Sequence, residues 1–284
     1  MLKKYHLYLI TLVLILASGL IASQVLDNYG RDYTDDALQR SLLTFGVARA
    51  LNGVISVAQG TEVAVQPAGL GVTFTPGEIL DPINDLVERF SWVMLLSSAS
   101  IGIQKTLLTI GAWSVFSWAT IALLLSAAIT LWLPQLRGHS TQGVLLKLAL
   151  LALVLRLAVP TIAIINEAVY QQFLAQQYDE ASVQLQQTTD NIGRINQRNL
   201  VSQYSNQTGS IWDAAKQFYN SAVEQVDIDA QLEQYKQATA EASLQLVNLI
   251  VVFLLQTVLL PLAFLAGLYW LLKYLVNTSM LNGD

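Results

Sequence analysis

The sequence predicts a mainly α-helical integral membrane protein with four membrane helices and two large segments outside the cytoplasm. Three observations lead to this fold class. The 284-residue chain is 54% hydrophobic, only 12% of its residues are charged, against about 25% in soluble domains, and its charges are kept apart from the long apolar runs. Of 20 acidic residues, only Asp284 lies outside the segments Asp27–Lys105 and Glu167–Ser243.

The first apolar run extends from Leu7 to Val25 and follows a basic start at Lys3 and Lys4. A basic start, an apolar middle and small residues after it are also typical of a signal peptide. The run is about as long as the roughly 17 to 25 residues that a helix needs to cross a bilayer. We therefore interpret residues 1–25 as the first membrane helix.

Residues 26–106 are expected to form a small α+β segment. Apolar residues recur at helical spacing and predict an amphipathic helix over Thr34 to Ala58. Apolar and polar residues then alternate on both sides of a turn signal at Pro67 to Gly69, which favours a short β-hairpin. Asp81 and Pro82 have the chemistry of an N-cap and a first helical position, so they predict the start of the next helix.

The second membrane helix is predicted over residues 107–133, in continuity with the helix that begins at Pro82. Trp113 and Trp132 are 19 positions apart, or about 28 Å along a helix, which is close to the hydrocarbon thickness of a bilayer. The stretch from Trp92 to Gly111 would then lie outside the bilayer or at its surface. We expect its small-residue patch, Ser97 to Ser100, to be buried against the β-hairpin and the amphipathic helix, or against another subunit.

The second half of the chain predicts a membrane helix, a helical hairpin and another membrane helix. The third helix should leave the membrane unbroken and stop near Asn191 to Gly193, and a capping box at Ser210 to Asp213 should begin the returning helix. A break in the returning helix is expected at Asp227 to Asp229. The weak heptad pattern of the hairpin is typical of a coiled coil. The boundaries are 134–143 for a cytoplasmic link, 144–166 for the third membrane helix, 167–244 for the hairpin, 245–272 for the fourth membrane helix and 273–284 for a cytoplasmic tail.

The distribution of basic residues predicts that both termini are cytoplasmic. Short loops rich in Lys and Arg stay on the cytoplasmic side of a membrane, and the short flanks here are basic. The two large segments would then face the periplasm if the membrane is a bacterial inner membrane. Aromatic residues cluster at the predicted inner interface, as expected of an aromatic belt. The basic flanking residues are Lys3, Lys4, Arg137, Lys147 and Lys273, and the aromatic residues are Tyr5, Tyr8, Trp132, Tyr269 and Trp270.

Arg156 and Pro160, in the third membrane helix, form the sharpest signal for a functional site. Arg156 lies about 13 Å from Lys147 by helical rise, near the predicted midplane. A guanidinium there costs roughly 2.5 to 3.5 kcal/mol on insertion scales, so it needs partners. Pro160 cannot donate to the carbonyl of Arg156, four residues earlier. Together the two residues predict a polar notch inside the membrane.

The predicted membrane runs contain no Asp or Glu, so we expect no intramembrane salt bridge to Arg156. Thr120, Gln256 and carbonyl groups loosened by Pro261 are the expected partners. Two interpretations stay open. Arg156 is either a hydrogen-bonded or snorkelling residue of a kinked helix, or part of an anion site, a lipid headgroup site or a conduction path.

No catalytic, cofactor or metal site is predicted. The chain has no cysteine, and its two histidines, His6 and His139, are far apart in sequence. Asp81, Asp85 and Glu88 share a helix face and could hold a hard cation, but acidic residues at a helix start are usually there for capping. Phosphate-loop, dinucleotide and nucleophile motifs are absent. The chain shows no basic face for nucleic acid.

The sequence favours a non-enzymatic membrane assembly or accessory protein, whose outer helices bind copies of itself or another envelope protein. The apolar stretch from Trp92 to Gly111 and the weakly amphipathic hairpin both need a surface to pack against. The alternative is a channel or transporter subunit that uses the notch at Arg156 and Pro160. An enzyme is disfavoured because no activated nucleophile or cofactor loop is visible.

Overall fold

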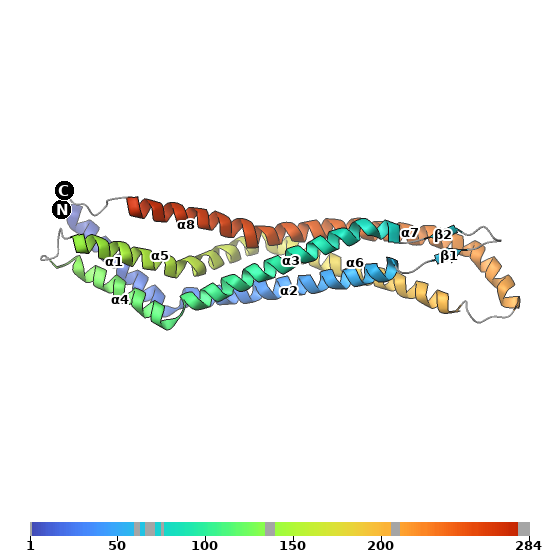
Figure 1. Cartoon of the computed structure of the whole chain (residues 1–284), viewed down its shortest axis with the longest axis horizontal. Helices are drawn as coiled ribbons and strands as arrows, with labels where there is room; N and C mark the ends of the chain where they lie inside the picture. The colour runs from blue at the N-terminus through green and yellow to red at the C-terminus, as the bar shows by residue number, and fades with distance from the viewer. Residues whose placement is uncertain are drawn as a thin grey trace. The chain divides into compact units, whose positions relative to one another are not determined.

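The computed structural model of the chain is almost entirely helical (Figure 1). It describes the backbone of residues 2–59, 63–65, 72–74, 77–133, 140–205 and 211–277, and the side chains of residues 5–59, 80–133, 142–197 and 233–274. The elements are α1 (Leu2–Ser23), α2 (Val25–Gln59), β1 (Val63–Val65), β2 (Val72–Phe74), α3 (Gly77–Gly111), α4 (Ser114–Thr130), α5 (Ser140–Val169), the π-helix η2 (Tyr170–Leu174), α6 (Ala175–Ser205), α7 (Ile211–Leu254), the π-helix η3 (Leu255–Leu259) and α8 (Leu260–Asn277).

Five helical stretches in the described part of the chain are long and apolar enough to cross a membrane, and α4 is a shorter apolar helix. This agrees with an integral membrane protein. Four membrane helices were predicted, and the two additional candidates are α2 and α3, so the count of four stays a prediction. The five stretches are Tyr5–Ser23, Val25–Gln59, Leu80–Gly111, Gln142–Gln197 and Glu233–Tyr274.

The predicted second membrane helix, residues 107–133, is wrong as one continuous element. The helix α3 ends at Gly111 and α4 begins at Ser114, with Trp113 in an extended conformation between them. Glycine has a low helix propensity, so Gly111 is a weak point in the run. Trp113 therefore lies at the corner between two helices rather than inside one.

The chain divides into two compact units, each built from separate segments. The first unit contains residues 1–39, 98–172 and 255–284. In it α4 packs against both α1 and α5, and α5 packs against α8. Apolar side chains from α1, α4 and α5 form its main core. The buried members of that core are Leu14, Ile21, Ile121, Leu124, Ala127, Ala128, Leu131, Leu146 and Ala149.

Two contacts fix details of packing in this first unit. Gly30 of α2 lies so close to α3 and α5 that a Cβ there would be 3.1 Å from Leu108 Cδ2 and 3.6 Å from Ala163 Cβ. At the opposite end of α1, the ring of Tyr8 packs edge-on to Trp132 with centroids 5.0 Å apart. The start of α2 therefore packs closely against α3 and α5, and the start of α1 packs against the residues that follow α4.

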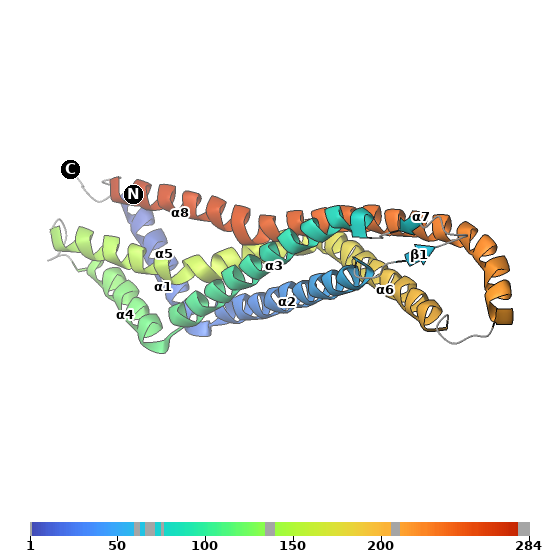
Figure 2. The same ribbon diagram turned by 45° about the vertical axis from the view of Figure 1, so that its right-hand side comes forward.

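The second unit contains residues 40–97 and 173–254, and α6 and α7 run side by side in it (Figure 2). Its core draws on α2, α3, α6 and α7, with Leu51, Phe90, Leu185 and Leu249 fully buried. Tyr178 packs edge-on to Phe253 with centroids 6.0 Å apart and shares a 3.2 Å hydrogen bond with Thr44. The second unit is therefore a four-helix bundle.

The segment between α2 and α3 contains two paired strands. Val63 faces Phe74 and Val65 faces Val72 in an antiparallel register, at the place where the hairpin was predicted. The start of the following helix was predicted wrongly, because α3 begins at Gly77 and Pro82 lies inside it. Asp81 does not cap the helix; its carboxylate accepts a 2.8 Å hydrogen bond from Gln59 Nε2.

The long polar helix after α5 also extends further than predicted. The chain stays helical from α5 through η2 and α6 to Ser205, past the expected stop at Gly193. Gly193 is a packing site, since a Cβ there would be 3.3 Å from Val54 Cγ1. The expected break at Asp227 to Asp229 lies within continuous α7. The predicted cap at Ser210, residues 134–139 of the link and the tail beyond Asn277 fall outside the described residues.

Candidate functional sites

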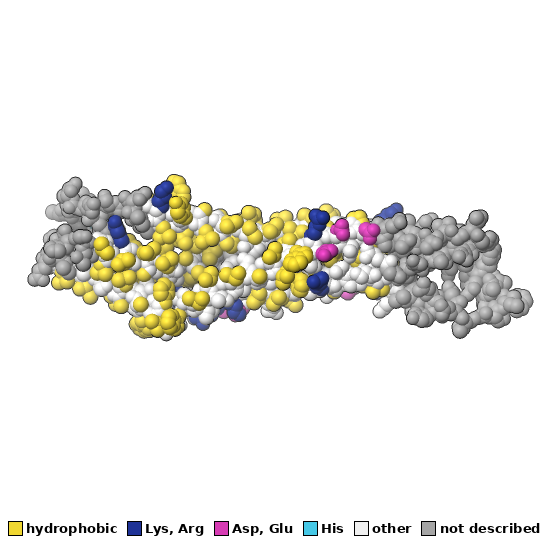
Figure 3. Space-filling view, in the orientation of Figure 1, with side chains coloured by type: hydrophobic (Ala, Val, Ile, Leu, Met, Phe, Trp, Pro, Cys, Tyr) yellow, Lys and Arg dark blue, Asp and Glu magenta, His cyan; other side chains and the backbone are white. Residues whose placement is uncertain are grey.

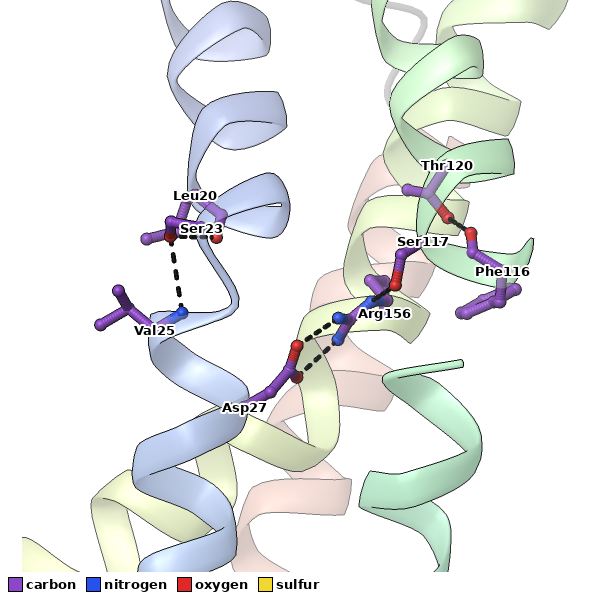
Figure 4. A network of polar contacts seen from close by, with 8 residues as sticks. All are labelled: Leu20, Ser23, Val25, Asp27, Phe116, Ser117, Thr120 and Arg156. Atoms are coloured by element: carbon purple, nitrogen blue, oxygen red, sulfur yellow. Dashed lines mark hydrogen bonds and ion pairs between the residues drawn. The ribbon is translucent and has the colours of Figure 1, made fainter. Parts of the chain in front are cut away.

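The chain turns sharply between α1 and α2, at Gln24. Gln24 has a φ of 53°, a left-handed conformation that costs a non-glycine residue energy. The hydroxyl of Ser23 donates to the carbonyl of Leu20 and accepts from the amide of Val25 (Figure 4). The turn places Asp27 in the first turn of α2, where a carboxylate is favoured by the helix dipole.

Asp27 forms a buried ion pair with Arg156 of α5 (Figure 4). Arg156 Nη1 donates to Asp27 Oδ1 at 2.8 Å, and Nη2 donates to Oδ2 at 2.5 Å. Arg156 Nε donates to the hydroxyl of Ser117 in α4 at 3.1 Å. Both charged residues are only 2% exposed. One site therefore joins α2, α4 and α5.

The geometry of this site explains how a guanidinium is accommodated in an apolar helix. A two-pronged contact between arginine and a carboxylate is among the strongest protein hydrogen-bonding arrangements. The two opposite charges cancel, and each nitrogen of Arg156 has an oxygen partner. Breaking such a buried pair by removing one member typically costs about 3 to 5 kcal/mol. The arrangement favours a structural role for Arg156.

The expected partners of Arg156 were wrong. The hydroxyl of Thr120 donates instead to the carbonyl of Phe116, at 2.9 Å. Gln256 lies in η3, where its backbone carbonyl accepts a hydrogen bond from Asn166 Nδ2. Pro160 is buried within α5. The prediction missed Asp27 because the residue follows the first apolar run and was assigned to the outer segment. The detectable signal was that Asp27 is the first acid after that run.

The ion pair also shows that Arg156 lies at a different position along the helix bundle from the one predicted. It lies beside Asp27, just past the end of α1, and beside Ser117, the fourth residue of α4. Counting from Lys147 had predicted a position near the middle of the span. The partners place Arg156 level with the α1–α2 turn, at the end of α1 opposite to the contact between Tyr8 and Trp132.

A second polar cluster lies in the first unit, between α5 and η3. Asn166 Nδ2 donates to the carbonyl of Gln256 at 3.4 Å, and the hydroxyl of Ser100 donates to the carbonyl of Thr257 at 3.2 Å. Asn166 Oδ1 and Gln256 Nε2 are buried and have no hydrogen-bond partner in the described part of the chain. A π-helix exposes backbone carbonyl groups and is often found at functional sites. Among the described residues of the first unit, Glu167 Oε2 is the other buried side-chain atom without a hydrogen-bond partner.

The acidic and imidazole groups considered for metal binding do not assemble into a site in the described residues. Asp81 is engaged with Gln59, and Asp85 and Glu88 are exposed. His6 is exposed, and His139 lies outside the described residues. A groove of about 420 Å³ in the second unit is lined by amides and by Arg194 and Glu241, on α6 and α7. It offers no nucleophile with an adjacent base.

The second unit exposes large apolar side chains along one side of α3 and of α7. We name these residues the α3–α7 face. Both helices contribute side chains to one core cluster, and Figure 3 shows hydrophobic side chains gathered over α3. The face consists of Trp92 (61% exposed), Leu95 (47%) and Leu96 (66%) on α3, and Leu244 (66%), Val247 (49%) and Val251 (51%) on α7.

The small-residue patch beside this face is buried, as predicted, at two of its four positions. Ser97 and Ser98 point inward, whereas Ala99 is exposed. Small inward residues let α3 approach neighbouring helices closely. The large apolar residues on the opposite side of α3 are exposed, with no cover from the part of the chain whose side chains are described.

Comparison of this chain with known proteins found no matching family model, no matching curated protein and no matching solved structure. Three features of the described chain bear on function: the ion pair, the cluster around Asn166 and Gln256 (the amide cluster) and the α3–α7 face.

Proposed function

We propose that this chain is a non-enzymatic assembly or accessory protein of a bacterial inner membrane. Its second unit would lie outside the cytoplasm and bind copies of the chain or another envelope protein. The observation that carries the proposal is the α3–α7 face, because contiguous exposed apolar surface of several hundred Å² marks a protein or membrane contact.

The distribution of charge around the second unit favours a protein partner over lipid for this face. Arg49 on α2 and Asp179 and Glu180 on α6 are exposed, and α3 itself carries the exposed pair Glu88 and Arg89 about a turn from Trp92. Charged side chains facing hydrocarbon are costly. Charged side chains so close to the α3–α7 face favour a protein as its cover, although α2 and α6 also expose large apolar residues such as Leu43 and Phe173.

Site-specific photo-crosslinking in intact cells tests the proposal. A photoreactive residue at Leu96 should give a covalent product with a second protein, and the same residue at Asp179 should give none. Both positions are exposed, so neither variant should disturb folding. If Leu96 yields no product under conditions where the protein is abundant and folded, the proposal fails.

A second candidate is a channel or transporter subunit, and the amide cluster is the observation that favours it. Polar side chains inside a membrane bundle commonly mark a substrate or ion path, and Asn166 and Gln256 each leave one buried polar atom unpaired. The saturated ion pair of Arg156 gives this candidate less support than the notch predicted from sequence. Solute and ion flux into vesicles that contain the Asn166→Leu/Gln256→Leu variant should fall relative to the native chain; equal or absent flux in both excludes this candidate.

A further inference from the structure

We infer that one water molecule is bound inside the first unit, between α5 and η3, where it bridges the side chains of Asn166 and Gln256. The need for such a bridge does not depend on the assembly role or on solute flux, because the unpaired atoms of these side chains need a partner in either case. The bound water is a fixed part of the fold and stabilises an irregular turn in an apolar helix.

The irregular turn, η3, has backbone carbonyl groups that its own helix does not serve. A π-helix pairs each carbonyl with the amide five residues later, and an α-helix pairs it with the amide four residues later. The helix α8 follows η3 directly and contains Pro261, whose nitrogen carries no hydrogen. The amide of residue 261 would serve the carbonyl of Gln256 in the π register and that of Thr257 in the α register. Pro261 can serve neither.

Side chains from α3 and α5 take the place of that missing amide. The hydroxyl of Ser100 donates to the carbonyl of Thr257 at 3.2 Å, and Asn166 Nδ2 donates to the carbonyl of Gln256 at 3.4 Å. This donation fixes the orientation of the Asn166 carboxamide, because the opposite orientation would set one acceptor oxygen against another. Asn166 Oδ1 is therefore an acceptor held beside η3.

Asn166 Oδ1 and Gln256 Nε2 are a complementary acceptor and donor, but neither has a hydrogen-bond partner among the residues that the structure describes. The two side chains are 0% and 2% exposed, so bulk solvent does not reach them. An unsatisfied buried polar atom costs free energy, and buried waters typically make about three hydrogen bonds to such groups. One water accepts from Gln256 Nε2 and donates to Asn166 Oδ1, which leaves its second hydrogen for a carbonyl oxygen of η3.

The donor at Gln256 favours water over a metal ion. A hard cation is bound by oxygen ligands alone, and it would repel an N–H group that points towards it. Water has both a lone pair and hydrogens, so it matches a site that combines a donor with acceptors. The neighbouring carboxylate of Glu167 is half-buried and accepts from Gln171 Nε2 at 2.7 Å. Two neutral amides thus match a neutral ligand.

Nuclear magnetic resonance tests the site in the full chain. The asparagine and glutamine side chains are isotopically labelled and the protein is held in deuterated detergent micelles. The side-chain amide protons of Gln256 should show cross-relaxation with water. Asn196 is the matched control: it is 4% exposed, but its Nδ2 donates to the carbonyl of Val54 at 2.7 Å and its Oδ1 accepts from Tyr235 at 2.8 Å. Its amide protons should show no such effect. Spectra of Gln256→Leu and Asn196→Leu assign the two signals by their loss.

A variant with a longer side chain tests which atoms hold the water. Asn166→Gln adds one methylene group, so that the carboxamide oxygen takes the place of the water and accepts from Gln256 Nε2 directly. The cross-relaxation at Gln256 should be lost, while the helicity measured by circular dichroism stays unchanged. The same exchange at an exposed position, Asn248→Gln in α7, should leave the cross-relaxation as it is in the native chain.

The outcomes separate a bound water from its alternatives. The inference is overturned if the Gln256 signal is observed without cross-relaxation, if the effect persists in Asn166→Gln, or if it appears equally at Asn196. It is also overturned if exchange of sodium for choline in the buffer shifts the Asn166 and Gln256 signals without any water contact, which would indicate a cation site that includes Glu167. If Asn166→Gln does not fold, the comparison of Gln256 with Asn196 in the native chain decides alone. None of these outcomes depends on the photo-crosslinking or flux results.

Discussion

At the scale of single residues, the chain stabilises a buried charge by bringing its partner from far away in sequence. Arg156 could be identified from the sequence because a cation within an apolar run is rare and costly. Asp27 could not be assigned as its partner, because 129 positions separate the two and only the turn at Gln24 brings the first residues of α2 to α5. Sequence spacing carries no information on such a contact.

Replacement of the charged residues should reveal strong coupling between them. Asp27→Leu and Arg156→Met should each lower the free energy of unfolding by about 3 to 5 kcal/mol, since each leaves an unpaired buried charge. The double variant should lose much less than the sum of the two, because no charge is left. Unfolding in mixed detergent micelles measures all three values, with Asp32→Asn on the surface as control. Additive losses would contradict a direct ion pair.

The left-handed residue between α1 and α2 leads to a prediction at the same scale. Gln24→Gly should keep or slightly raise the stability, because glycine adopts a positive φ without steric cost. Gln24→Val should lower the free energy of unfolding, because a β-branched side chain is disfavoured at positive φ more strongly than glutamine is. Thermal unfolding of the two variants checks this, and equal melting temperatures for glycine and valine would argue against the left-handed turn.

At the scale of elements, the sequence predicted the existence of the helices better than their ends. The long apolar runs and the returning helical hairpin were recognisable because their periodicity extends over many residues. Gly111 and Gly193 show why the ends were not. The first coincides with a break between α3 and α4, whereas the second lies within α6 against Val54, and only the neighbouring helix distinguishes the two cases.

The contact of Gly193 with α2 can be tested by a compensating change. Gly193→Leu should destabilise the second unit by about 1 to 3 kcal/mol, because the added side chain overpacks the space beside Val54. Val54→Ala should restore part of the loss by making room, although it costs stability alone. Chemical unfolding of the single and double variants measures the coupling. If Val54→Ala restores no stability to Gly193→Leu, the contact between these two residues is not the cause of the loss.

At the scale of the whole molecule, composition and charge segregation were sufficient to predict a helical membrane protein. They were insufficient to fix the number of membrane spans. The helices α2 and α3 are also apolar enough to cross a membrane, yet both carry exposed charged residues, such as Arg49 and Glu88. The sequence predicted only the α3 part of the α3–α7 face, as an apolar stretch from Trp92 that needs a surface to pack against. The sequence did not show which side of α3 is exposed. In the structure Ser97 and Ser98 are buried on the side opposite to Trp92, Leu95 and Leu96.

The predicted orientation can be mapped with single cysteines in this cysteine-free chain. Asp179→Cys should react with a membrane-impermeant maleimide in intact cells, because α6 is expected outside the cytoplasm. Lys273→Cys, near the end of α8, should react only after the membrane is permeabilised. Mass shifts on gels report the labelling. Reaction of Lys273→Cys in intact cells would reverse the proposed topology.

The neutrality of the pair between Asp27 and Arg156 has an electrical consequence. A lone arginine that crosses a membrane exchanges about 2.3 kcal/mol with each 100 mV of transmembrane voltage, which is how voltage sensors work. In this chain the positive charge is bound to a negative one through two hydrogen bonds. If α2 and α5 shift together, the voltage does almost no net work on the pair. Arg156 paired in this way fastens helices without itself acting as a voltage-sensing charge.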